Sequence, residues 1–319
     1  MNSDAHRRNV GKVSSETGKK YEVQSDEEIK EKPIKYGPIP SFPYQRVWAR
    51  AVLILGAIVV VYWTSQGGDV VLARQKDFLE QRAQEVPCSE EYKKEIEKFP
   101  DCVPERCGRM VTDKLVSTHE VGILLRIAEQ GIGLGGSEGG ASILDLHSGA
   151  LSQGKNFVNI YKLDTVKDLF KPADFLTYRI LKLKLQHKVA QHFGLKASAL
   201  HLTHPTFFSR LTSAPAQTVH DEYWHPHVDK ETYESFHYTC LVYLSDFGHD
   251  FKGGRFVYMD TDRNTTVEPR RGRVSMFTSG WENRHLVEQV TEGTRYAITV
   301  SFTCDKSRAI ADPALPGKK

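Results

Sequence analysis

The part of the sequence after Leu200 most restricts the fold, because its apolar residues stop repeating at helical spacing and begin to alternate in short runs. Gly, Asp and Asn turn residues separate these runs. In chain order the runs are PTFFSRL, the segment around HPHVDK, YTCLVYLS, GGRFVYM, TTVEP, RVSMFTS, HLVEQV and TRYAITVSF. Seven or eight short strands in about 100 residues predict a β-sandwich or barrel, because such strands bury their apolar faces only against a second sheet.

Two helical patterns precede the strands. Ser117-Thr118-His119-Glu120 is a capping box in front of the apolar run VGILLRIAEQG. A second pattern runs from Pro172 to Gly194, with the glycine at the position that ends a helix. The glycine-rich stretch GIGLGGSEGGASILDLHSG between them lacks the Gly-Lys-Ser/Thr of a phosphate-binding loop, so we predict a mobile loop. We expect a mostly β fold whose helices cover one outer face.

One long apolar run lies near the N-terminus. Residues 51–68 carry no charge over 18 positions, with Trp48 at one end and Tyr62 and Trp63 at the other. A bilayer core needs about 20 mostly apolar residues, and aromatic residues favour its two interfaces. We therefore interpret residues 47–68 as a single-pass transmembrane helix. A buried core helix is the alternative, and the long polar segment before the run argues against a cleaved signal peptide and for a signal anchor.

Composition suggests the remaining boundaries. Residues 1–46 are polar and contain four prolines, which predicts a disordered tail. We expect a charged juxtamembrane stem over 69–110, a helical support region over 111–199, the β domain over 200–306, and a tail over 307–319. Residues 1–50 hold ten Lys/Arg and seven Asp/Glu, which leaves 33 of each in the rest of the chain. Without a basic domain, nucleic acid is not an expected partner.

The cysteines and one sequon bear on orientation. Cys88, Cys102 and Cys107 admit one disulfide among themselves and then leave one of the three unpaired, whereas Cys240 and Cys304 lie in β runs and are interpreted as buried core thiols. Asn264 begins the sequon Asn-Thr-Thr and is a candidate glycosylation site. Both features favour a type II protein whose C-terminal portion lies in the lumen of the secretory pathway. The Lys/Arg counts on the two sides of the apolar run do not decide the orientation.

The sharpest candidate for chemistry is His227-Val228-Asp229. On a strand, residues i and i+2 point to one face, so both side chains can reach one metal. His285 is the candidate third ligand, 56 residues after Asp229. Two imidazoles and one carboxylate hold Fe(II) on one side and leave three positions open for substrates and O₂. The HxD triplet is common by chance, and the neighbouring stretch His220–Glu222, His225 and the triplet Asp145-Leu146-His147 are weaker alternatives.

Arg295 lies ten residues after His285, in the run TRYAITVSF, and shares a strand face with Ala297 and Thr299. No Asp or Glu occurs between Gly293 and Cys304. An unpaired buried arginine is costly, so the sequence predicts a ligand carboxylate that the guanidinium binds in bidentate fashion.

The motifs HPHVD, YTCLVYLS, GGRFVYM, RRGRVSMFTSG, His285 and TRYAITVSF together resemble the prolyl-hydroxylase-type Fe(II)- and 2-oxoglutarate-dependent dioxygenases over roughly residues 200–304. The resemblance implies a double-stranded β-helix (jelly roll). It also implies hydroxylation of a protein or peptide side chain, prolyl as the first guess, with release of succinate and CO₂, and ascorbate as reductant.

The resemblance also assigns roles to residues. It makes His227, Asp229 and His285 ligands of Fe(II), and Arg295 the partner of the distal carboxylate of 2-oxoglutarate, with Thr299 and Tyr243 as hydroxyl donors to it. One departure stands out. Many relatives carry a tyrosine three residues before the first iron histidine, where this chain has Trp224, and on a regular strand the neighbouring Tyr223 would face the other way.

Two other function classes remain open from sequence. A non-catalytic jelly-roll binding or scaffold protein would keep the fold without turnover, and it leaves the intact candidate iron set without a use. A zinc-dependent hydrolase could use the same His and Asp groups, but no further general base stands beside HxD and Arg295 has no role in it.

Overall fold

The computed structural model describes residues 43–65, 68–163 and 169–313. The chain divides into two compact units, Met1–Thr64 and Ser65–Lys319. Most of the predicted N-terminal tail (1–42) and the last residues of the C-terminal tail (314–319) lie outside the described residues, so those two predictions stay untested.

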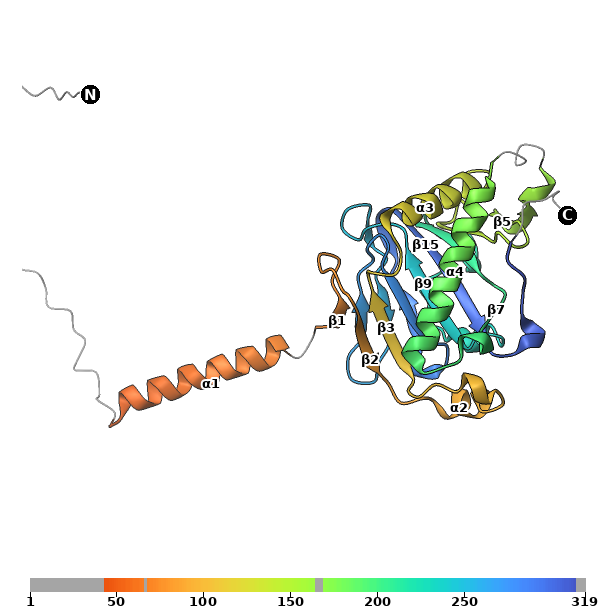
Figure 1. Ribbon diagram of the computed structural model, residues 1–319. Coiled ribbons are helices and arrows are strands. Elements are labelled where there is room, and N and C mark those ends of the chain that lie inside the picture. The colour runs from red at the N-terminus through yellow and green to blue at the C-terminus, as the bar shows by residue number, and fades with distance from the viewer. Residues whose placement is uncertain (1–42, 66–67, 164–168, 314–319) are drawn as a thin grey trace, which may run out of the picture. The chain divides into compact units, whose positions relative to one another are not determined.

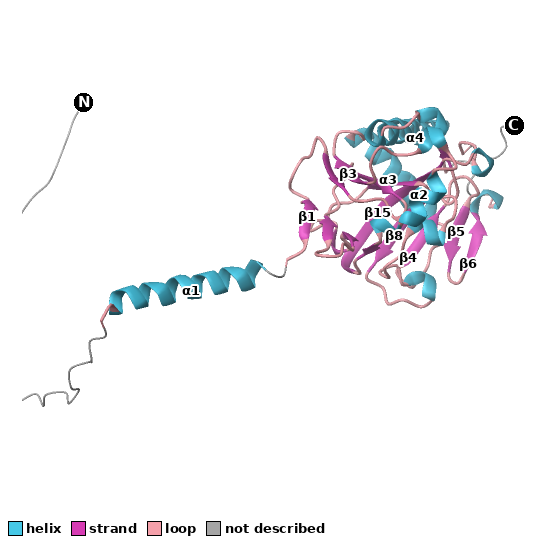
Figure 2. Cartoon of the chain, turned by 90° about the horizontal axis from the view of Figure 1, so that it is seen from below, coloured by secondary structure: helices cyan, strands magenta, loops and turns pink. Residues whose placement is uncertain are grey.

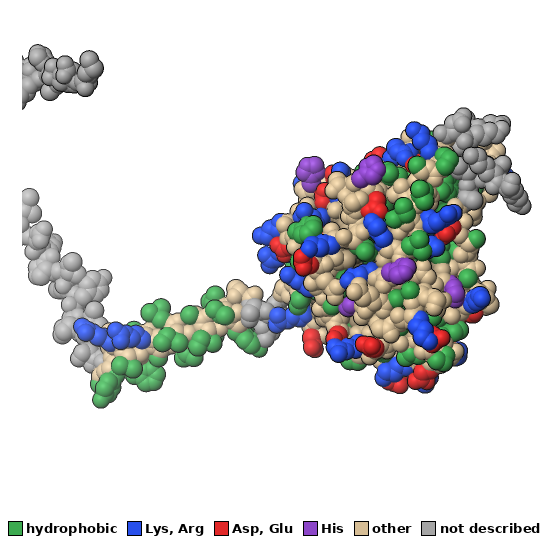
Figure 3. Space-filling view, in the orientation of Figure 1, with side chains coloured by type: hydrophobic (Ala, Val, Ile, Leu, Met, Phe, Trp, Pro, Cys, Tyr) green, Lys and Arg blue, Asp and Glu red, His purple; other side chains and the backbone are tan. Residues whose placement is uncertain are grey.

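The described part of the first unit is the helix α1 (Gln45–Ser65). Its window Gln45–Thr64 has a mean hydropathy of 1.9 and none of it is buried inside the protein. Figure 3 shows hydrophobic side chains along this helix, whereas charges of both signs are interspersed on the visible face of the second unit. The helix is therefore long and apolar enough to cross a bilayer.

The second unit is built on two β-sheets (Figures 1 and 2). The larger sheet has the order β2-β3-β13-β9-β15-β8-β4-β5-β6, with β7 and β10 also paired to β15. Its strands are β2 (Arg82–Glu85), β3 (Gly108–Thr112), β4 (Ala141–Leu144), β5 (Ala150–Gln153), β6 (Asn156–Asn159), β7 (His201–Leu202), β8 (Phe207–Thr212), β9 (Tyr238–Tyr243), β10 (Phe251–Gly253), β13 (Val274–Thr278) and β15 (Val290–Thr303).

The smaller sheet has the order β1-β12-β11-β14. Its strands are β1 (Val70–Ala73), β11 (Phe256–Tyr258), β12 (Thr265–Val267) and β14 (His285–Val287). A buried cluster between the sheets takes side chains from both, including Phe256 and Tyr258 of the smaller sheet and Phe277 and Ala297 of the larger one. This arrangement confirms the predicted mostly β, jelly-roll class.

Two long helices cover the outer face of the larger sheet (Figure 1). They are α3 (Thr118–Ile132) and α4 (Pro172–Phe193), and their buried residues share one core cluster with the outward-facing residues of β9, β13 and β15. Ser117 and Glu120 form the predicted capping box, and Gly194 ends α4 with a φ of 74°. Both helix predictions are confirmed. The short helices α2 (Glu90–Ile96) and α5 (Asp229–Thr232) complete the unit.

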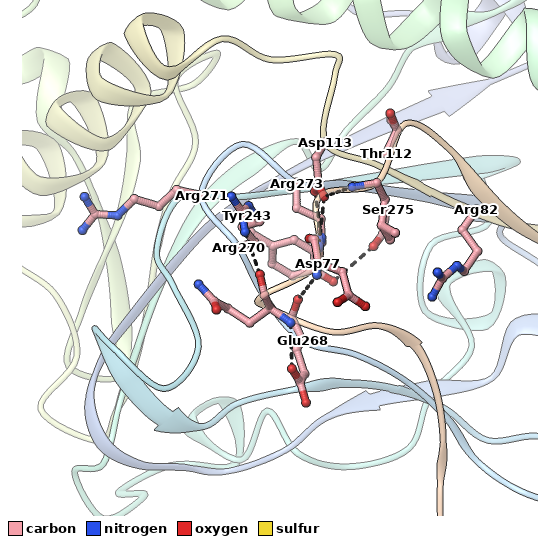
Figure 4. A network of polar contacts seen from close by, with 12 residues as sticks. Asp77, Arg82, Thr112, Asp113, Tyr243, Glu268, Arg270, Arg271, Arg273 and Ser275 are labelled. Carbon is pink, nitrogen blue, oxygen red and sulfur yellow. Dashed lines mark hydrogen bonds and ion pairs between the residues drawn. The ribbon is translucent and has the colours of Figure 1, made fainter.

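The expected stem is not a separate segment. It contributes β1 to the smaller sheet and β2 and β3 to the larger one. Just after this segment, a buried ion pair forms, since Arg273 Nε and Nη2 donate to the Asp113 carboxylate at 2.8 and 2.9 Å (Figure 4). Arg273 also donates to the backbone carbonyls of Arg74, Glu268 and Asp77. Residues 69–110 are therefore part of the β unit, and charged side chains among them form ion pairs within it.

Two sequence predictions are wrong in this region. Cys304 is not a free core thiol, because it forms a disulfide with Cys102, while Cys88 pairs with Cys107. The glycine-rich stretch is not wholly a loop, because it contains β4, which pairs with β8. The half-buried alternation over Ala141–Leu144 suits a strand that pairs with β8 on one side and β5 on the other. Cys240 is a free buried thiol as predicted, and burial raises its pKa.

Candidate metal centre

A cavity of about 290 Å³ opens between the two sheets and holds most of the predicted site residues. Its polar lining includes His227, Asp229, His285, Arg295 and Thr299. Most of the rest is apolar or aromatic: Ala141, Ile143, Phe207, Leu211, Tyr223, Tyr233, Phe236, Leu241, Phe256, Phe277 and Val287. A few convergent polar groups in an apolar pocket are typical of a site for a small ligand.

The three predicted metal ligands converge. One ligand atom from each of His227, Asp229 and His285 lies within 4.8 Å of the other two. Nε2 of each histidine is 3.7 Å from Oδ1 of Asp229. Asp229 and His285 are 7% and 4% exposed, whereas His227 is half-buried, so one side of the centre opens toward the cavity mouth. Among the described residues, these three side chains form the one group of three or more potential metal ligands whose spacing suits a single ion.

Hydrogen bonds fix which nitrogen of each histidine is free. Nδ1 of His227 lies 3.0 Å from the carbonyl oxygen of His225, and Nδ1 of His285 lies 2.9 Å from that of Asn283. A carbonyl oxygen only accepts, so each Nδ1 carries the proton and each Nε2 offers its lone pair. This is the orientation in which histidines bind a metal, with a backbone carbonyl as the second partner.

The Asp229 carboxylate and the buried His285 imidazole are also preorganised for metal binding. Thr239 Oγ1 donates to Asp229 Oδ2 at 2.6 Å, which leaves Oδ1 directed at the two histidines. Burial lowers the pKa of His285 to about 4, against the opposing effect of Asp229. The His285 imidazole is therefore neutral at physiological pH, as a ligand must be.

The backbone brings these residues together differently from the prediction. His227 is not on a regular strand with Asp229, because Asp229 begins α5. Instead, His227 and His285 form an isolated antiparallel bridge, with both N–H to O=C distances at 2.9 Å. The two rings consequently lie with centroids 4.4 Å apart. Pairing with β14, rather than alternation along one strand, places the HxD triplet.

Arg295 is the second feature of the cavity, beside the three metal-ligand candidates, that is preorganised for a ligand. Its side chain is 1% exposed, and Nε donates to the carbonyl of Gly254 at 2.9 Å. Nη2 is buried with no hydrogen-bond partner among the described residues. Burial lowers the pKa of this guanidinium, and no carboxylate of the described residues forms an ion pair with it. A buried guanidinium with a free N–H in a cavity fits a carboxylate ligand.

Three hydroxyl-bearing side chains that lie near Arg295 differ in their contacts. Thr299 lines the cavity, as expected. The centre of the Tyr243 ring lies 5.5 Å from the Arg295 guanidinium carbon. The Tyr243 hydroxyl, however, lies 3.3 Å from Ser275 Oγ (Figure 4 shows Tyr243 and Ser275). Tyr223 lines the cavity, contrary to expectation, because the segment before it is the 3₁₀ turn Val219–Asp221 and not a strand. Its hydroxyl accepts from Val290 N at 2.9 Å.

The weaker alternatives are occupied by other contacts. Nδ1 and Nε2 of His147 lie 2.9 Å from the carbonyl of Ala311 and the hydroxyl of Tyr178, so this imidazole has no nitrogen left for a metal. Asp221 accepts from Ser137 Oγ and from the Thr218 backbone. His225 pairs with Glu222 at 2.7 Å.

Comparison with known proteins gives two findings that agree. The family described as the 2OG-Fe(II) oxygenase superfamily matches residues 214–303, a range that contains all three candidate ligands and Arg295. 2-Oxoglutarate and iron-dependent oxygenase domain-containing protein 3 of Xenopus tropicalis is 53% identical over 274 residues, which is 84% of this chain and 86% of the relative. The chain belongs to the 2OG-Fe(II) oxygenase superfamily. As a 2OG-Fe(II) oxygenase it is an oxidoreductase, and the superfamily uses Fe(II), 2-oxoglutarate and O₂.

Two more distant proteins are also similar to this 2OG-Fe(II) oxygenase. Prolyl 3-hydroxylase 2 of Rattus norvegicus is 30% identical over 136 residues, which is 37% of this chain and 19% of that protein. A 2OG-Fe(II) oxygenase family oxidoreductase from Burkholderia pseudomallei, a solved structure, covers 77% of this chain and 100% of its own, with 14% identity and a TM-score of 0.42.

Proposed function

We propose that the chain is a membrane-anchored Fe(II)- and 2-oxoglutarate-dependent dioxygenase that hydroxylates a side chain of a protein or peptide and releases succinate and CO₂. One observation carries the proposal. A two-histidine, one-carboxylate cluster lies in the same cavity as Arg295, whose buried N–H lacks a partner among the described residues. A metal alone would leave that guanidinium without a role, whereas a chelating keto-diacid would use both features.

The roles of the residues follow from their chemistry. In the proposal His227, Asp229 and His285 hold Fe(II), and Arg295 binds the distal carboxylate of 2-oxoglutarate. Thr299 offers a hydroxyl to the same carboxylate, and Tyr243 would do so by giving up its contact with Ser275. Bound iron, 2-oxoglutarate and O₂ supply the oxidation of a C–H bond, which none of the cavity side chains can perform.

The protein supplies orientation and a dry environment. The two Nδ1–H bonds to backbone carbonyls keep both imidazoles directed at one point. The aromatic walls, among them Phe256 stacked on His285 at a centroid distance of 4.7 Å, exclude water from that point. No general base is needed in this proposal, because bound iron, 2-oxoglutarate and O₂ supply the oxidation.

The substrate proposal rests on the cavity wall and one relative. Tyr233 and Phe236 stack at 4.8 Å and line the cavity, which suits a compact apolar ring or chain. The name of prolyl 3-hydroxylase 2 supports a prolyl residue as the first substrate to test. Proline-containing peptides that gain one oxygen atom with the wild-type chain, and none with a His227→Ala variant, would support this choice. Gain of oxygen on another residue type would replace it.

The membrane proposal rests on α1 and on the disulfides. We propose that α1 crosses the bilayer as a signal anchor and that the second unit lies in the lumen of the secretory pathway, as a type II protein. The disulfides Cys88–Cys107 and Cys102–Cys304 support an oxidising compartment. Glycosylation of Asn264, which is partly exposed and immediately precedes β12, belongs to the same proposal.

The test of the activity is succinate release. The full chain in detergent is given Fe(II), 2-oxoglutarate, O₂ and ascorbate, the proposed reductant, and succinate is measured with a candidate peptide. Wild type is expected to release succinate in step with peptide hydroxylation, and His227→Ala to release none. Binding of zinc without any binding of 2-oxoglutarate would contradict the proposal and favour a hydrolase.

A further inference from the structure

A short turn before His285 supports two of the three proposed iron ligands. This turn, residues 278–283, ends in the 3₁₀ helix Trp281–Asn283. The Asn283 carbonyl accepts the Nδ1–H of His285 at 2.9 Å. At its other end the Ser279 hydroxyl lies 2.8 Å from Thr239 Oγ1, which donates to Asp229 Oδ2. The position of this turn therefore determines how His285 and Asp229 are aimed.

The segment closed by the Cys88–Cys107 disulfide lies directly against the turn. Ser89 donates from its backbone N and its Oγ to Glu282 Oε2, at 3.2 and 2.8 Å. The carbonyl of Gly108 accepts from Asn283 Nδ2 at 3.3 Å. A methyl group on Gly280 would meet Tyr92 Cβ at 2.7 Å, so the two backbones are in close contact.

The disulfide fixes the spacing of these contacts. Ser89 and Gly108 immediately follow Cys88 and Cys107, and the bond holds those cysteines with their Cα atoms 5.1 Å apart. Two contact points far apart in the chain thus act as one rigid support. Without the bond, the Ser89 contact depends on the β2–β3 pairing and on the Tyr92 hydroxyl of α2, which donates to the His237 carbonyl at 3.0 Å.

Asn283 is suited to receive this support. Its Nδ2 lies within hydrogen-bonding distance of three acceptors, the Gly108 carbonyl and the carbonyl and hydroxyl of Thr278. Its Oδ1 has no partner among the described residues, and the side chain is 1% exposed. The side chain acts as a buried donor whose loss would leave several acceptors unsatisfied.

We propose that the Cys88–Cys107 segment is a positioning element of the iron site, acting on His285 through Ser89, Glu282 and Asn283. It sets the carbonyl that orients the His285 ring, so loosening it weakens Fe(II) binding while all three ligands remain. The inference rests on the proposed function, because it requires that these three residues bind iron. Partners of metal ligands typically contribute about 10- to 100-fold to metal affinity.

The decisive experiment compares two serines. Ser89 and Ser117 both cap a helix N-terminus with their hydroxyl, but Ser117 contacts Glu120 of its own helix and not the turn. Fe(II) alone is titrated anaerobically into the full chain in detergent, and the dissociation constant is measured by calorimetry. Ser89→Ala is expected to raise the Kd about 10-fold, whereas Ser117→Ala leaves it within about twofold. Both variants lose one helix cap, so equal losses of thermal stability are expected.

A second pair of variants separates positioning from folding. Glu282→Gln keeps an acceptor for Ser89 and is expected to bind Fe(II) nearly as wild type does, whereas Glu282→Ala is expected to weaken binding as Ser89→Ala does. Replacing both cysteines of the Cys88–Cys107 pair by serine should weaken Fe(II) binding about 10-fold or more. Replacing both of Cys102–Cys304 should lower the melting temperature with a much smaller change in Kd.

The outcomes distinguish this inference from the proposed function. If wild type binds no Fe(II), the proposed function fails first. If wild type binds Fe(II) but Ser89→Ala and Glu282→Ala bind it as tightly as Ser117→Ala does, the positioning role is wrong and the iron site stands. A lowered melting temperature with an unchanged Kd in the Ser89 variant would also overturn the inference.

Discussion

Two of the fully buried arginines in the second unit, Arg273 and Arg295, should respond in opposite ways to replacement by methionine. Arg273 forms a bidentate pair with Asp113 and three further bonds to backbone carbonyls. Arg295 has one bond, to the Gly254 carbonyl, and an unpartnered Nη2 among the described residues. Arg273 is therefore satisfied by the fold itself, and Arg295 is satisfied only when a ligand supplies an acceptor.

The magnitudes follow from these contacts. Arg295→Met removes one bond and one uncompensated charge, so the free energy of unfolding without ligand should change by no more than about 1–2 kcal/mol. The same variant loses two charge-assisted hydrogen bonds to 2-oxoglutarate, at about 1.5 kcal/mol each at the low end. The resulting ~3 kcal/mol corresponds to a rise in Kd of about 150-fold. Arg273→Met leaves Asp113 buried and unpaired, which should cost about 3–5 kcal/mol of stability.

The assay pairs urea unfolding without ligands with calorimetric titration of 2-oxoglutarate into the Fe(II)-loaded, anaerobic chain. Arg295→Lys keeps the charge without the planar fork and should give an intermediate affinity. The reasoning is refuted if Arg295→Met unfolds as easily as Arg273→Met while its affinity for 2-oxoglutarate stays at the wild-type value. That pattern would make Arg295 a structural residue like Arg273.

Three further predictions follow from single residues. Thr299→Val removes a cavity hydroxyl and should raise the Kd of 2-oxoglutarate about 5- to 10-fold by calorimetry, from about 1 kcal/mol per hydrogen bond, with Fe(II) affinity unchanged; a change confined to Fe(II) would contradict this role. Burial lowers the pKa of His237 to about 3, so the folded chain holds it neutral while the unfolded chain protonates it below about pH 6.5. Its stabilising contribution is complete above that pH and should decline by about 2 kcal/mol between pH 7 and 5, and His237→Asn should lessen this decline in urea titrations; identical pH dependence in both chains would argue against it. Asn264→Gln should abolish a mobility shift that endoglycosidase produces in the wild-type chain from a eukaryotic host, and an unshifted wild-type band would remove this support for a lumenal second unit.

Local sequence patterns predicted the elements whose determinants are local. The capping box at Ser117 begins one helix and Gly194 ends another, each through contacts within a few residues, and both are found as expected. The period-2 runs after Leu200 predicted two facing sheets, because alternation decides which face is buried. His227, Asp229, His285 and Arg295 were predicted to form one site from their residue types and from the family resemblance, and all four line one cavity.

Other features depend on contacts between distant parts of the chain. Cys102 and Cys304 are 202 residues apart, and no spacing rule pairs them. The charged residues 69–110 were interpreted as a stem because their partners, such as Asp260 for Arg109, lie far along the chain. Tyr223 was expected to face away on a regular strand, but a 3₁₀ turn precedes it and the side chain lines the cavity. The support of His285 by Asn283 carries no sequence signal, since a backbone carbonyl makes it.

The most direct test of the iron site is the stoichiometry and affinity of Fe(II) in wild type and in a His285→Ala variant. Anaerobic titration of the full chain should show one tight Fe(II) per wild-type chain and a loss of tight binding in the variant, which keeps His227 and Asp229. Retention of one equally tight Fe(II) by the His285→Ala chain would contradict the account.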